Sequence, residues 1–595
     1  MKTLIQNLFL LLFISSCSLL FERNTDRDFQ VKANAGTIIG IDEGDHYSFK
    51  GIPYAQPPVG DLRWRAPKDL PRSSEPILAV DYKSSCVQPG GGDFNFSFTR
   101  EVYSGDEDCL YLNIFVPQNQ TVFEKNNFPV MFWIHGGANI YGAGSDYDFS
   151  KLATSQQVII VTMNYRLGLF GWFTSEHLKD TSEGLDKSSN FGQLDIIKAL
   201  EWVQSNIDYF GGDSSNVTIF GESAGGHNIL TLLASPLGKG LFHRAISQSG
   251  YIESYSLEFA KRGSPLSSEK LFEEDIKSLI NSEDIAEKLR EIPAGEIYER
   301  VIKISQESDW AEIPKTTRDG IVVPLKGLYS GLRDVDPDIV VVAGTNRDEL
   351  NYYFIQSEYF YDTTFDLKRS LKRSEENLKS WIKYRSEIWR FRGAEEPLRA
   401  MSKNNNNLYS YRFDWDEEAN SNLFGNYQLF LGAPHGMDIP FVSGEFDLGP
   451  INFYIKPIIF PSESEEGRLA LNELMMKYWA NIAKYGDPNA FLNGPKWEKF
   501  SKDKQQFLIL DNPIDNELSM VQDPVDIDVL LSEVESDSSL EIAERCIIGW
   551  IAANERNELK QANSLADISD PPYSFCSNFE KEYLIRLFNK VDGRD

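Results

Sequence analysis

The sequence predicts an α/β fold in which a mostly parallel central sheet carries helices on both faces. Two observations lead to this prediction. Short apolar runs, typical of buried parallel strands, recur along the chain at 129–134, 158–163, 216–220, 245–247 and 338–343. Helical spacing lies between such runs, most clearly at 194–203. Because strands that alternate with helices form a parallel sheet covered on both faces, we expect this architecture here.

One large domain with additions at both ends is expected. A length of 595 residues would suggest several domains, but α/β domains often run long as one unit. We therefore assign 36–525 to a single domain. Within it, 251–330 and 355–430 are richer in charge and are expected to form helical excursions that cap the pocket. The segment 526–595 is expected to be a helical extension, with a helix at 541–560.

The N-terminus has the pattern of an export signal at 1–17. Lys2 precedes an apolar run at 8–14 that is shorter than a membrane-spanning helix needs. The run ends in Ile14-Ser15-Ser16-Cys17, which is similar to a bacterial lipoprotein box, so Cys17 is expected to be lipidated. A plain secretory signal with an incidental cysteine is the alternative. Either way we expect an exported chain, held in the cell envelope by the lipid or else secreted or periplasmic. A polar tether is expected at 18–35.

The charge balance narrows the choice of partners. The chain has 59 basic and 89 acidic residues, a net charge of −30. Nucleic-acid binding requires a basic surface, so no nucleic-acid partner is expected. The excess of acidic residues is interpreted as favouring solubility. Membrane contact is expected only through the N-terminal lipid. The sequence shows no repeat, no phosphate loop and no metal-ligand spacing, so no cofactor and no metal are predicted.

A candidate nucleophile stands at Ser223. It lies in Gly221-Glu222-Ser223-Ala224-Gly225, directly after the apolar run 216–220 and before a helix-forming stretch. A strand, a Gly-x-Ser-x-Gly turn and a helix form the nucleophile elbow of an α/β-hydrolase. The glycines are needed because the turn is too tight for side chains and the serine backbone is strained. A surface loop with this pattern by chance is the alternative.

A serine nucleophile needs a base, and the base needs an acid. In this fold the order along the chain is Ser, then Asp or Glu, then His. His435 lies between Pro434 and Gly436, in a loop suited to aim one side chain. Asp348 and Glu349 both follow the predicted strand at 338–343, on the edge where the elbow would lie. The pattern alone leaves both acids open.

The remaining part is a group that stabilises an oxyanion. The predicted strand at 129–134 ends in His135-Gly136-Gly137-Ala138, an oxyanion turn of the HGGG type. Its small residues leave backbone N–H groups accessible, and the N–H of Ala224 would complete the set. Losing one such donor typically costs on the order of 10²–10³ in rate. The His135 side chain is expected to pack beneath the loop and to take no part in chemistry.

Several motifs together resemble the type-B carboxylesterase/lipase family, which includes cholinesterases and bacterial para-nitrobenzyl esterases. The resemblance spans roughly residues 30 to 525 and is closest in style to the bacterial esterases. It rests on Gly51-Ile52-Pro53-Tyr54-Ala55, Pro57-Pro58-Val59-Gly60, Leu62-Arg63, Glu107-Asp108-Cys109-Leu110-Tyr111-Leu112-Asn113, Asn164-Tyr165-Arg166, Phe210-Gly211-Gly212-Asp213 and the run from Gly221 to Gly226.

The resemblance implies roles for individual residues. The implied triad is Ser223, Glu349 and His435, because the family acid is the Glu of an Asn-x-Asp-Glu run. The implied oxyanion donors are the N–H groups of Gly137, Ala138 and Ala224. Ser249 matches a serine that supports the acid, and Glu222 is placed with it in the layer around the triad. Arg63 and Glu107 match a family ion pair.

The resemblance also bears on the five cysteines. It implies a disulfide between Cys86 and Cys109, while a bond between Cys546 and Cys576 is a further hypothesis. Cys17 is then the unpaired one, which suits lipidation, and disulfides suit an exported chain. The loop from Cys86 to Cys109 has no Trp. Cholinesterases use a Trp there to bind a quaternary ammonium, so this chain is not expected to be a choline-ester specialist.

The predicted function is carboxylic-ester hydrolysis by a serine carboxylesterase that acts on a small-molecule ester through an acyl-enzyme. One alternative is a catalytically silent adhesion or binding protein on the same fold; such relatives usually lack the serine, which this chain retains. Another is cleavage of lipids or amides by the same machinery. Tyr352 and Tyr353 follow Glu349 closely and either border the pocket or pack elsewhere.

Overall fold

The computed structural model describes most of the chain after the predicted signal. The described residues are 27–71, 74–90, 102–119, 127–279, 285–308, 312–362, 370–421, 425–447, 452–492, 494–554, 559–560 and 573–593. The predicted signal at 1–17 and Cys17 lie outside these residues, as do 18–26 of the predicted tether.

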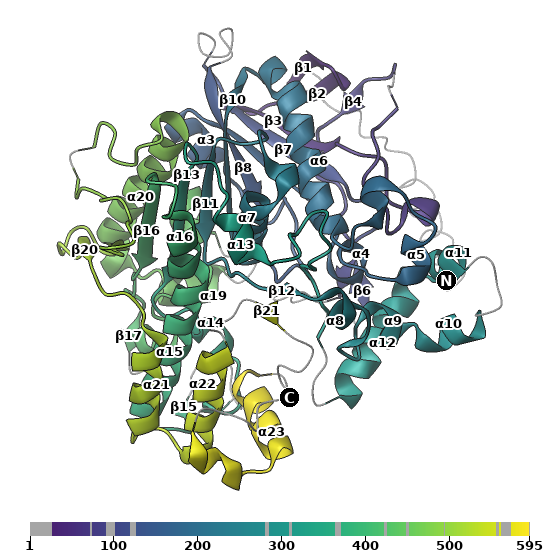
Figure 1. Cartoon of the computed structure of the whole chain (residues 1–595). Coiled ribbons are helices and arrows are strands. Elements are labelled where there is room, and N and C mark those ends of the chain that lie inside the picture. The colour runs from purple at the N-terminus through teal and green to yellow at the C-terminus, as the bar shows by residue number, and fades with distance from the viewer. Residues whose placement is uncertain are drawn as a thin grey trace, which may run out of the picture.

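A 13-stranded sheet runs through the described part of the chain (Figure 1). In spatial order its strands are β1 (Asp28–Ala33), β2 (Gly36–Asp42), β3 (His46–Pro53), β7 (Tyr111–Pro117), β9 (Ile159–Met163), β8 (Phe128–Ile134), β10 (Gly212–Glu222), β11 (Arg244–Gln248), β13 (Val340–Asn346), β16 (Leu408–Phe413), β19 (Phe507–Leu510) and β20 (Ser519–Val521), with β4 (Ile77–Leu78) beside β2. The seven strands from β9 to β19 are parallel, which confirms the predicted α/β architecture.

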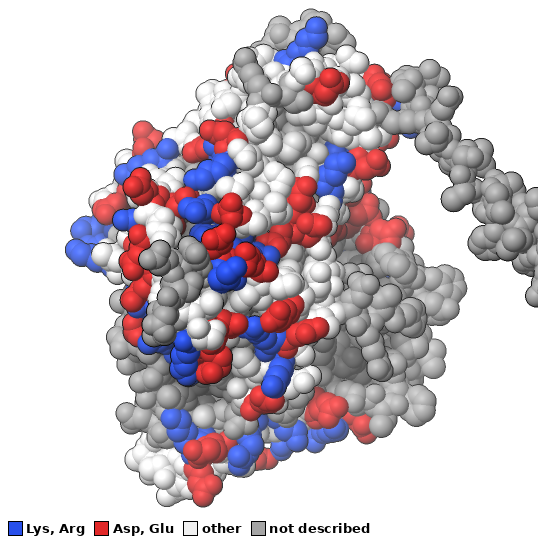
Figure 2. Space-filling view, turned by 90° about the vertical axis from the view of Figure 1, so that its right-hand side faces the viewer, with Lys and Arg blue, Asp and Glu red and all other residues white. Residues whose placement is uncertain are grey.

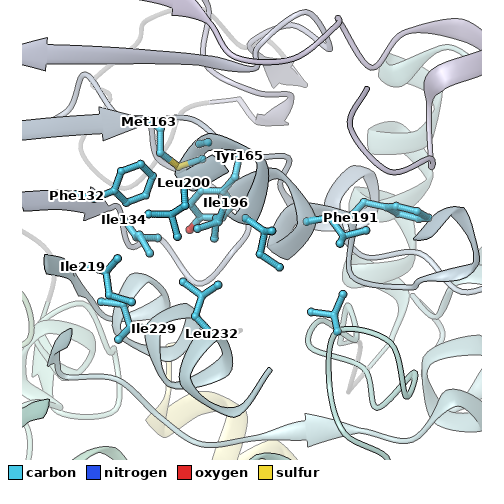
Figure 3. Close-up of a cluster of buried hydrophobic side chains, with 14 of the residues drawn as sticks. Phe132, Ile134, Met163, Tyr165, Phe191, Ile196, Leu200, Ile219, Ile229 and Leu232 are labelled. Carbon is cyan, nitrogen blue, oxygen red and sulfur yellow. The ribbon is translucent and has the colours of Figure 1, made fainter. Parts of the chain in front are cut away.

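The strands bury both faces, as their continuous apolar runs predict. On one face Phe132, Ile134 and Ile219 pack against helices α6 (Phe191–Asn206) and α7 (Ala224–Ala234), as Figure 3 shows. On the other face Met131 and Trp133 pack in a second cluster that includes residues of α20 (Glu465–Tyr485). Successive side chains of a strand point to opposite faces, so one strand supplies both clusters.

The first strands correct one prediction. We expected a tether at 18–35, but residues 28–33 form β1, which pairs with β2 in antiparallel register. The reason is the alternation of Phe29 and Val31 with polar residues, which lets one side of β1 pack on the core. The other antiparallel pairs of the 13-stranded sheet are β2 with β3, β3 with β7, β7 with β9, and β19 with β20.

The two predicted excursions are rich in helix. The first contains α8 (Leu257–Arg262), α9 (Ser268–Leu271), α10 (Glu273–Ser278), α11 (Ile285–Glu291), α12 (Ala294–Glu307) and α13 (Leu328–Leu332). The second contains α15 (Glu375–Arg390), a π-helical turn at Phe391–Glu395 and α16 (Glu396–Met401). Shorter helices near the site are α14 (Asn351–Phe354) and α18 (Asp438–Ser443).

Past the end of the sheet, the chain forms α21 (Ile527–Ser536), α22 (Ile542–Asn554), a 3-10 turn (Ser574–Asn578) and α23 (Lys581–Val591). These helices lie at the bottom of Figure 1 and share a third apolar cluster with α15. The helix expected at 541–560 is shorter, because Leu559–Lys560 form strand β21, which pairs with β12 (Ser254–Tyr255).

The surface of the described residues is charged with both signs. On the face drawn in Figure 2, acidic side chains are interspersed with basic ones rather than gathered into one block. Within the described residues, no helix combines the length and apolar character needed to cross a bilayer.

Candidate active site

The parallel strands bring the predicted site together at one edge of the sheet. Strand β8 is next to β10, and a single strand, β11, lies between β10 and β13. The turns that follow β8, β10 and β13 begin at the carboxyl ends of these parallel strands. Those turns hold His135, Ser223 and Glu349 respectively. Ligand sites in such sheets lie outside the carboxyl ends of the strands, so the topology places these three residues at the edge where a site is expected.

Ser223 occupies a strained turn between β10 and α7. Its backbone has φ 57° and ψ −120°, a conformation that residues with a side chain rarely adopt. The turn is wedged against the neighbouring strand, because a Cβ on Gly221 or Gly225 would overlap the carbonyl oxygen of Ile134. Glycine at these two positions is therefore a steric requirement, and the hydroxyl is held at the first turn of a helix.

Ser223, His435 and Glu349 form a continuous chain of contacts. The Ser223 Oγ lies 2.7 Å from His435 Nε2, and His435 Nδ1 lies 2.5 Å from Glu349 Oε2. The Glu349 side chain is fully buried, and its Oε1 accepts the backbone N–H of Asn346 at 2.8 Å. Of the two acids that the sequence left open, Glu349 is thus the one that touches the imidazole. Asp348 faces the backbone of Ala433 instead.

The predicted oxyanion turn adjoins the serine. A Cβ placed on Gly136 would lie 3.2 Å from Ser223 Cβ, so the two turns are in contact. Gly137, Ala138 and Asn139 have φ of 91°, 54° and 58°, a run of left-handed residues that turns the chain sharply. Among the described residues, no protein acceptor takes up the N–H of Gly137 or Ala138. These donors are free to bind an oxyanion.

His135 packs beneath this turn, as expected. Its ring stacks on Tyr165 with centroids 4.3 Å apart, and its Nδ1 lies 2.9 Å from the carbonyl oxygen of Gly136. Burial lowers the pKa of His135 to about 4, so the imidazole stays neutral. The side chain supports the turn without offering a proton to the site.

Buried carboxylates surround the imidazole. Glu222 Oε1 lies 3.2 Å from His435 Nε2, so Glu222 contacts the candidate base directly. Burial raises the pKa of Glu222 to about 8. Burial by itself would lower the pKa of His435, but the carboxylates of Glu222 and Glu349 outweigh it and raise that pKa to about 9. Burial also raises the pKa of Asp438, which accepts hydrogen bonds from Gln248 and Tyr411.

Ser249 does not hold the position that the family resemblance implies. Its hydroxyl is buried, but it forms no hydrogen bond to Glu349 or to any other described residue. Its backbone N–H instead binds the carbonyl of Gly344, and its own carbonyl accepts the indole N–H of Trp389 at 3.2 Å. Its backbone has a left-handed φ of 48°. The Glu349 carboxylate accepts the backbone N–H of Asn346 instead.

Aromatic rings border the imidazole. The ring of Trp389 lies 4.8 Å from that of His435, with Tyr353 at 5.9 Å and Tyr352 at 6.3 Å. The sequence left open whether the two tyrosines border the pocket or pack elsewhere, and it did not single out Trp389. Trp389 belongs to α15, which is distant in sequence from His435. The one sequence signal for it is its place within a segment that was predicted to cap the pocket.

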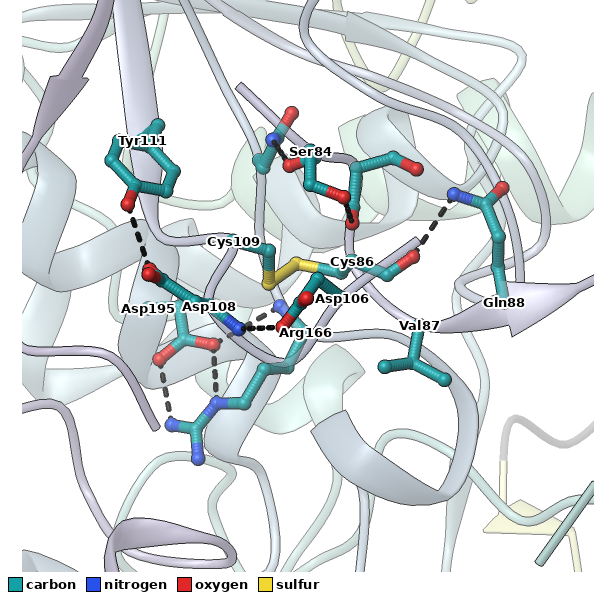
Figure 4. The surroundings of a disulfide bond; sticks show 12 residues. Ser84, Cys86, Val87, Gln88, Asp106, Asp108, Cys109, Tyr111, Arg166 and Asp195 are labelled. Atoms are coloured by element: carbon teal, nitrogen blue, oxygen red, sulfur yellow. Dashed lines mark hydrogen bonds and ion pairs between the residues drawn. A yellow bond between two sulfur atoms is a disulfide. The ribbon is translucent and has the colours of Figure 1, made fainter. Parts of the chain in front are cut away.

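Both expected disulfides are present. Cys86 bonds Cys109, and Cys546 bonds Cys576. The first lies near the buried ion pair of Arg166 with Asp195, as Figure 4 shows. The ion pair of Arg63 with Glu107 is also formed.

One group of carboxylates could approach a cation. Among the described residues, oxygen atoms of Glu417, Asp515 and Glu517 lie within 4.8 Å of one another, and two of these residues are exposed. The Asn512 amide already donates to Glu417 and Asp515. The sequence gave no sign of this group, because nearly 100 residues separate Glu417 from Asp515 and Glu517.

Comparisons with known proteins identify the family of this chain. The model of the carboxylesterase family matches residues 27–390 and 355–525. The para-nitrobenzyl esterase of Bacillus subtilis (strain 168) is 33% identical over 506 residues, which cover 81% of this chain and 95% of that protein. The cocaine esterase of Homo sapiens is 31% identical over 505 residues, which cover 77% of this chain and 82% of that protein.

Solved structures give the same result. A para-nitrobenzyl esterase structure aligns with a TM-score of 0.66 at 30% identity and covers 83% of this chain and 97% of its own. A carboxylesterase of Geobacillus stearothermophilus aligns with a TM-score of 0.64 at 26% identity, over 83% and 98% of the two chains. The predicted α/β-hydrolase architecture is thereby confirmed.

Proposed function

Because this chain belongs to the carboxylesterase family, we propose that it hydrolyses carboxylic esters with Ser223, His435 and Glu349 as its catalytic triad. The observation that carries the proposal is the unbroken series of contacts from Ser223 Oγ to His435 Nε2, at 2.7 Å, and from His435 Nδ1 to Glu349 Oε2, at 2.5 Å. These distances lie at or just below the usual range for a nucleophile with its base and a base with its acid.

The first half of the reaction makes an acyl-enzyme. His435 Nε2 takes the hydroxyl proton as Ser223 Oγ attacks the ester carbonyl carbon, and the carbonyl oxygen becomes an oxyanion. The N–H groups of Gly137, Ala138 and Ala224 stabilise that charge. The C–O bond to the alcohol then breaks, and the leaving oxygen takes the proton from His435.

The second half releases the acid. A water molecule gives a proton to His435 Nε2 and attacks the acyl carbon, and the same N–H groups stabilise the second oxyanion. The bond to Ser223 Oγ breaks, and the oxygen recovers its proton from His435. Glu349 accepts the hydrogen bond of Nδ1–H, which fixes the tautomer of the imidazole, and it stabilises the imidazolium that forms in each half.

The substrate class follows from the family and from the walls of the site. Carboxylesterases act on small esters, and the rings of Trp389, Tyr352 and Tyr353 offer apolar contacts beside the imidazole. A panel of para-nitrophenyl esters of graded acyl length would define the preferred acyl group. Matched amides in the same panel would separate ester from amide cleavage.

The test of the triad uses Ser223→Ala. We expect kcat to fall by 10⁴-fold or more, on the order of what a lost nucleophile costs in serine hydrolases. A fluorophosphonate probe should label the wild type and not Ser223→Ala. The control is Ser215→Ala, on the exposed first part of β10, which should behave as wild type. Full activity in folded Ser223→Ala would refute the proposal.

We also propose that the chain is exported and anchored through a lipid on Cys17. The support is the signal-like pattern at 1–17 together with two disulfides in the described residues, which form in oxidising compartments. Metabolic labelling with a radioactive fatty acid should mark the wild type in a bacterial host and leave Cys17→Ser unlabelled. Equal labelling of both, or of neither, would contradict the anchor.

A further inference from the structure

Two loops meet behind the catalytic histidine. The first is the acid turn, residues 346–351, which follows β13 and carries Glu349. The second is the histidine loop, residues 431–435, which precedes α18. The acid turn begins at the last residue of β13 and ends at the first residue of α14, whereas the histidine loop contains no strand or helix, so contacts between the two loops help to set the distance between Glu349 and His435.

Asp348 makes a double contact between them. Its backbone N–H donates to the carbonyl oxygen of Ala433 at 3.0 Å, and its Oδ2 accepts the N–H of Ala433 at 3.1 Å. Gly432 beside it has φ 54°, and a Cβ there would overlap Asp348 Oδ2. The carboxylate thus binds the backbone two residues before His435 and fills the space that a side chain at Gly432 would need.

Arg347 fixes the carboxylate from the other side. Its Nε and Nη2 donate to Asp348 Oδ2 at 2.9 and 2.7 Å. The same Nη2 donates to Asp416 at 2.8 Å, and the Arg347 backbone N–H binds the carbonyl of Phe413 at the end of β16. Asp348 is therefore tied to the sheet as well as to the histidine loop.

Two amides reinforce the connection. Asn346 Nδ2 donates to the carbonyl of Pro434 at 2.6 Å, and Asn351 Nδ2 donates to that of Leu431 at 2.8 Å. The backbone N–H of His435 also donates to the carbonyl oxygen of Glu349 at 3.4 Å, so the acid turn binds the histidine loop at Leu431, Ala433, Pro434 and His435. Asp348 stands in the middle of this series and supplies its only charged acceptor among the described residues.

We propose that Asp348 is a positioning residue that sets the distance between His435 and Glu349. This inference rests on the proposed function. Asp348 has no hydrogen bond to the His435 ring within the described residues, so its effect passes through the backbone of the histidine loop. A displacement of about 1 Å in a catalytic group can cost about 10²-fold in rate. Loosening the loop should accordingly lower kcat and leave KM nearly unchanged.

The experiment compares three variants of the full chain. Asp348→Ala removes the acceptor for the Ala433 N–H, and Asp348→Asn keeps an oxygen there but removes the charge. Asp416→Asn is the matched control, because it removes the same charge from the other partner of Arg347 and leaves the Ala433 contact intact. We expect kcat losses of about 10- to 100-fold, about 3- to 10-fold and less than 2-fold, in that order.

The pH profile separates positioning from a general loss of structure. The charged groups that face His435 are Glu222, Glu349 and Asp438, which together raise its pKa against the effect of burial. If Asp348→Ala loosens the contact with Glu349, the acid limb of kcat/KM should move to lower pH. The limb of Asp416→Asn should stay in place, because that variant changes charge without moving the loop.

The outcomes are distinct. If Asp348→Ala does not fold, Asp348→Asn decides: a kcat below that of Asp416→Asn supports the inference, and an equal kcat overturns it. Wild-type kcat and pH profile in folded Asp348→Ala also overturn it. If wild type is active and Ser223→Ala is inactive, such a result refutes only the positioning role. Full activity of Ser223→Ala would instead refute the proposed function itself.

Discussion

The two halves of the candidate site are held in place by different physical means. The half that carries Ser223 is wedged sterically: the glycines of the elbow lie so close to the backbone of β8 that no side chain fits. The half that carries His435 is tied by polar contacts between loops, above all those of Asp348 with Ala433. Closely packed backbone leaves no room for an added side-chain atom, whereas a loop held by several hydrogen bonds can lose one of them and shift only slightly. Substitutions on the two sides should therefore fail in different ways.

The largest effect on the histidine side is expected from Glu349→Gln. The amide would keep the shape of the acid but could not stabilise the imidazolium, and it would favour the wrong tautomer of His435. By analogy with the equivalent change in serine proteases, kcat should fall by about 10⁴-fold with little loss of stability.

Steady-state kinetics and chemical unfolding would check this pair of results. Glu544→Gln, at a fully buried carboxylate of α22, controls for the loss of a buried charge away from the site. A loss below 10-fold in Glu349→Gln would mean that Glu349 is not the acid partner.

On the serine side, Gly225→Ala should damage both stability and activity. The new Cβ would overlap the carbonyl oxygen of Ile134 and the backbone at His135, so the elbow or the oxyanion turn must shift. We expect a loss of about 3 kcal/mol or more in the free energy of unfolding, and at least about 10²-fold in kcat.

Gly494→Ala is the matched control for that change. Its nearest neighbours, on Leu474 and Tyr478, would lie 3.8 Å from a Cβ, and its backbone is not left-handed. Its unfolding free energy should stay within about 0.5 kcal/mol of wild type. If Gly225→Ala is as mild as this control, the steric account of the elbow is wrong.

The same contrast explains what the sequence could predict. Ser223 and the oxyanion turn follow from local patterns, since a strand, a glycine turn and a helix occupy consecutive residues. His435 follows from the order of residues along the chain and from its loop, but the choice of Glu349 over Asp348 needed the family resemblance, because it depends on a contact between residues 86 positions apart. The alternation in β1 predicts a strand where we expected a tether. Trp389 and the absent Ser249 contact could not be predicted, because they depend on how distant segments pack.

A smaller effect is expected from Glu222→Gln, at the boundary between the two halves. Glu222 belongs to the elbow but contacts His435 Nε2 at 3.2 Å. Its carboxylate helps to raise the pKa of His435 to about 9, so its removal should lower that pKa. Since the neutral imidazole is the base, the acid limb of kcat/KM should move down by about one pH unit or more.

The pH profile of para-nitrophenyl ester hydrolysis would measure that shift. Glu349 and Asp438 continue to face the ring in this variant, so part of the elevation should remain. Asp416→Asn again serves as the control for charge. An unmoved limb would show that Glu222 does not act on the histidine.

The smallest effect on activity is expected from the extension, whose helices pack against α15 on the histidine side. Glu544 of α22 accepts hydrogen bonds from Tyr359, Asn377 and Trp381, and through α15 the extension supports the helix that ends beside His435. Glu544→Ala would leave the Tyr359 hydroxyl and the Trp381 indole N–H without this acceptor, and would leave Asn377 with the carbonyl of Ser539 alone. The free energy of unfolding should fall by about 3 kcal/mol, while kcat at 25 °C should change by less than about 3-fold.

Glu541→Ala, on the exposed residue that pairs with Arg373, is the control and should be close to wild type in both respects. The rate of fluorophosphonate labelling would report whether Ser223 and its base are still correctly placed, because the reaction needs both. If α15 transmits the damage, labelling of Glu544→Ala should slow in proportion to kcat, since Trp389 and His435 move together. If labelling and kcat both stay at the wild-type level while stability falls, the extension stabilises the fold without positioning the histidine.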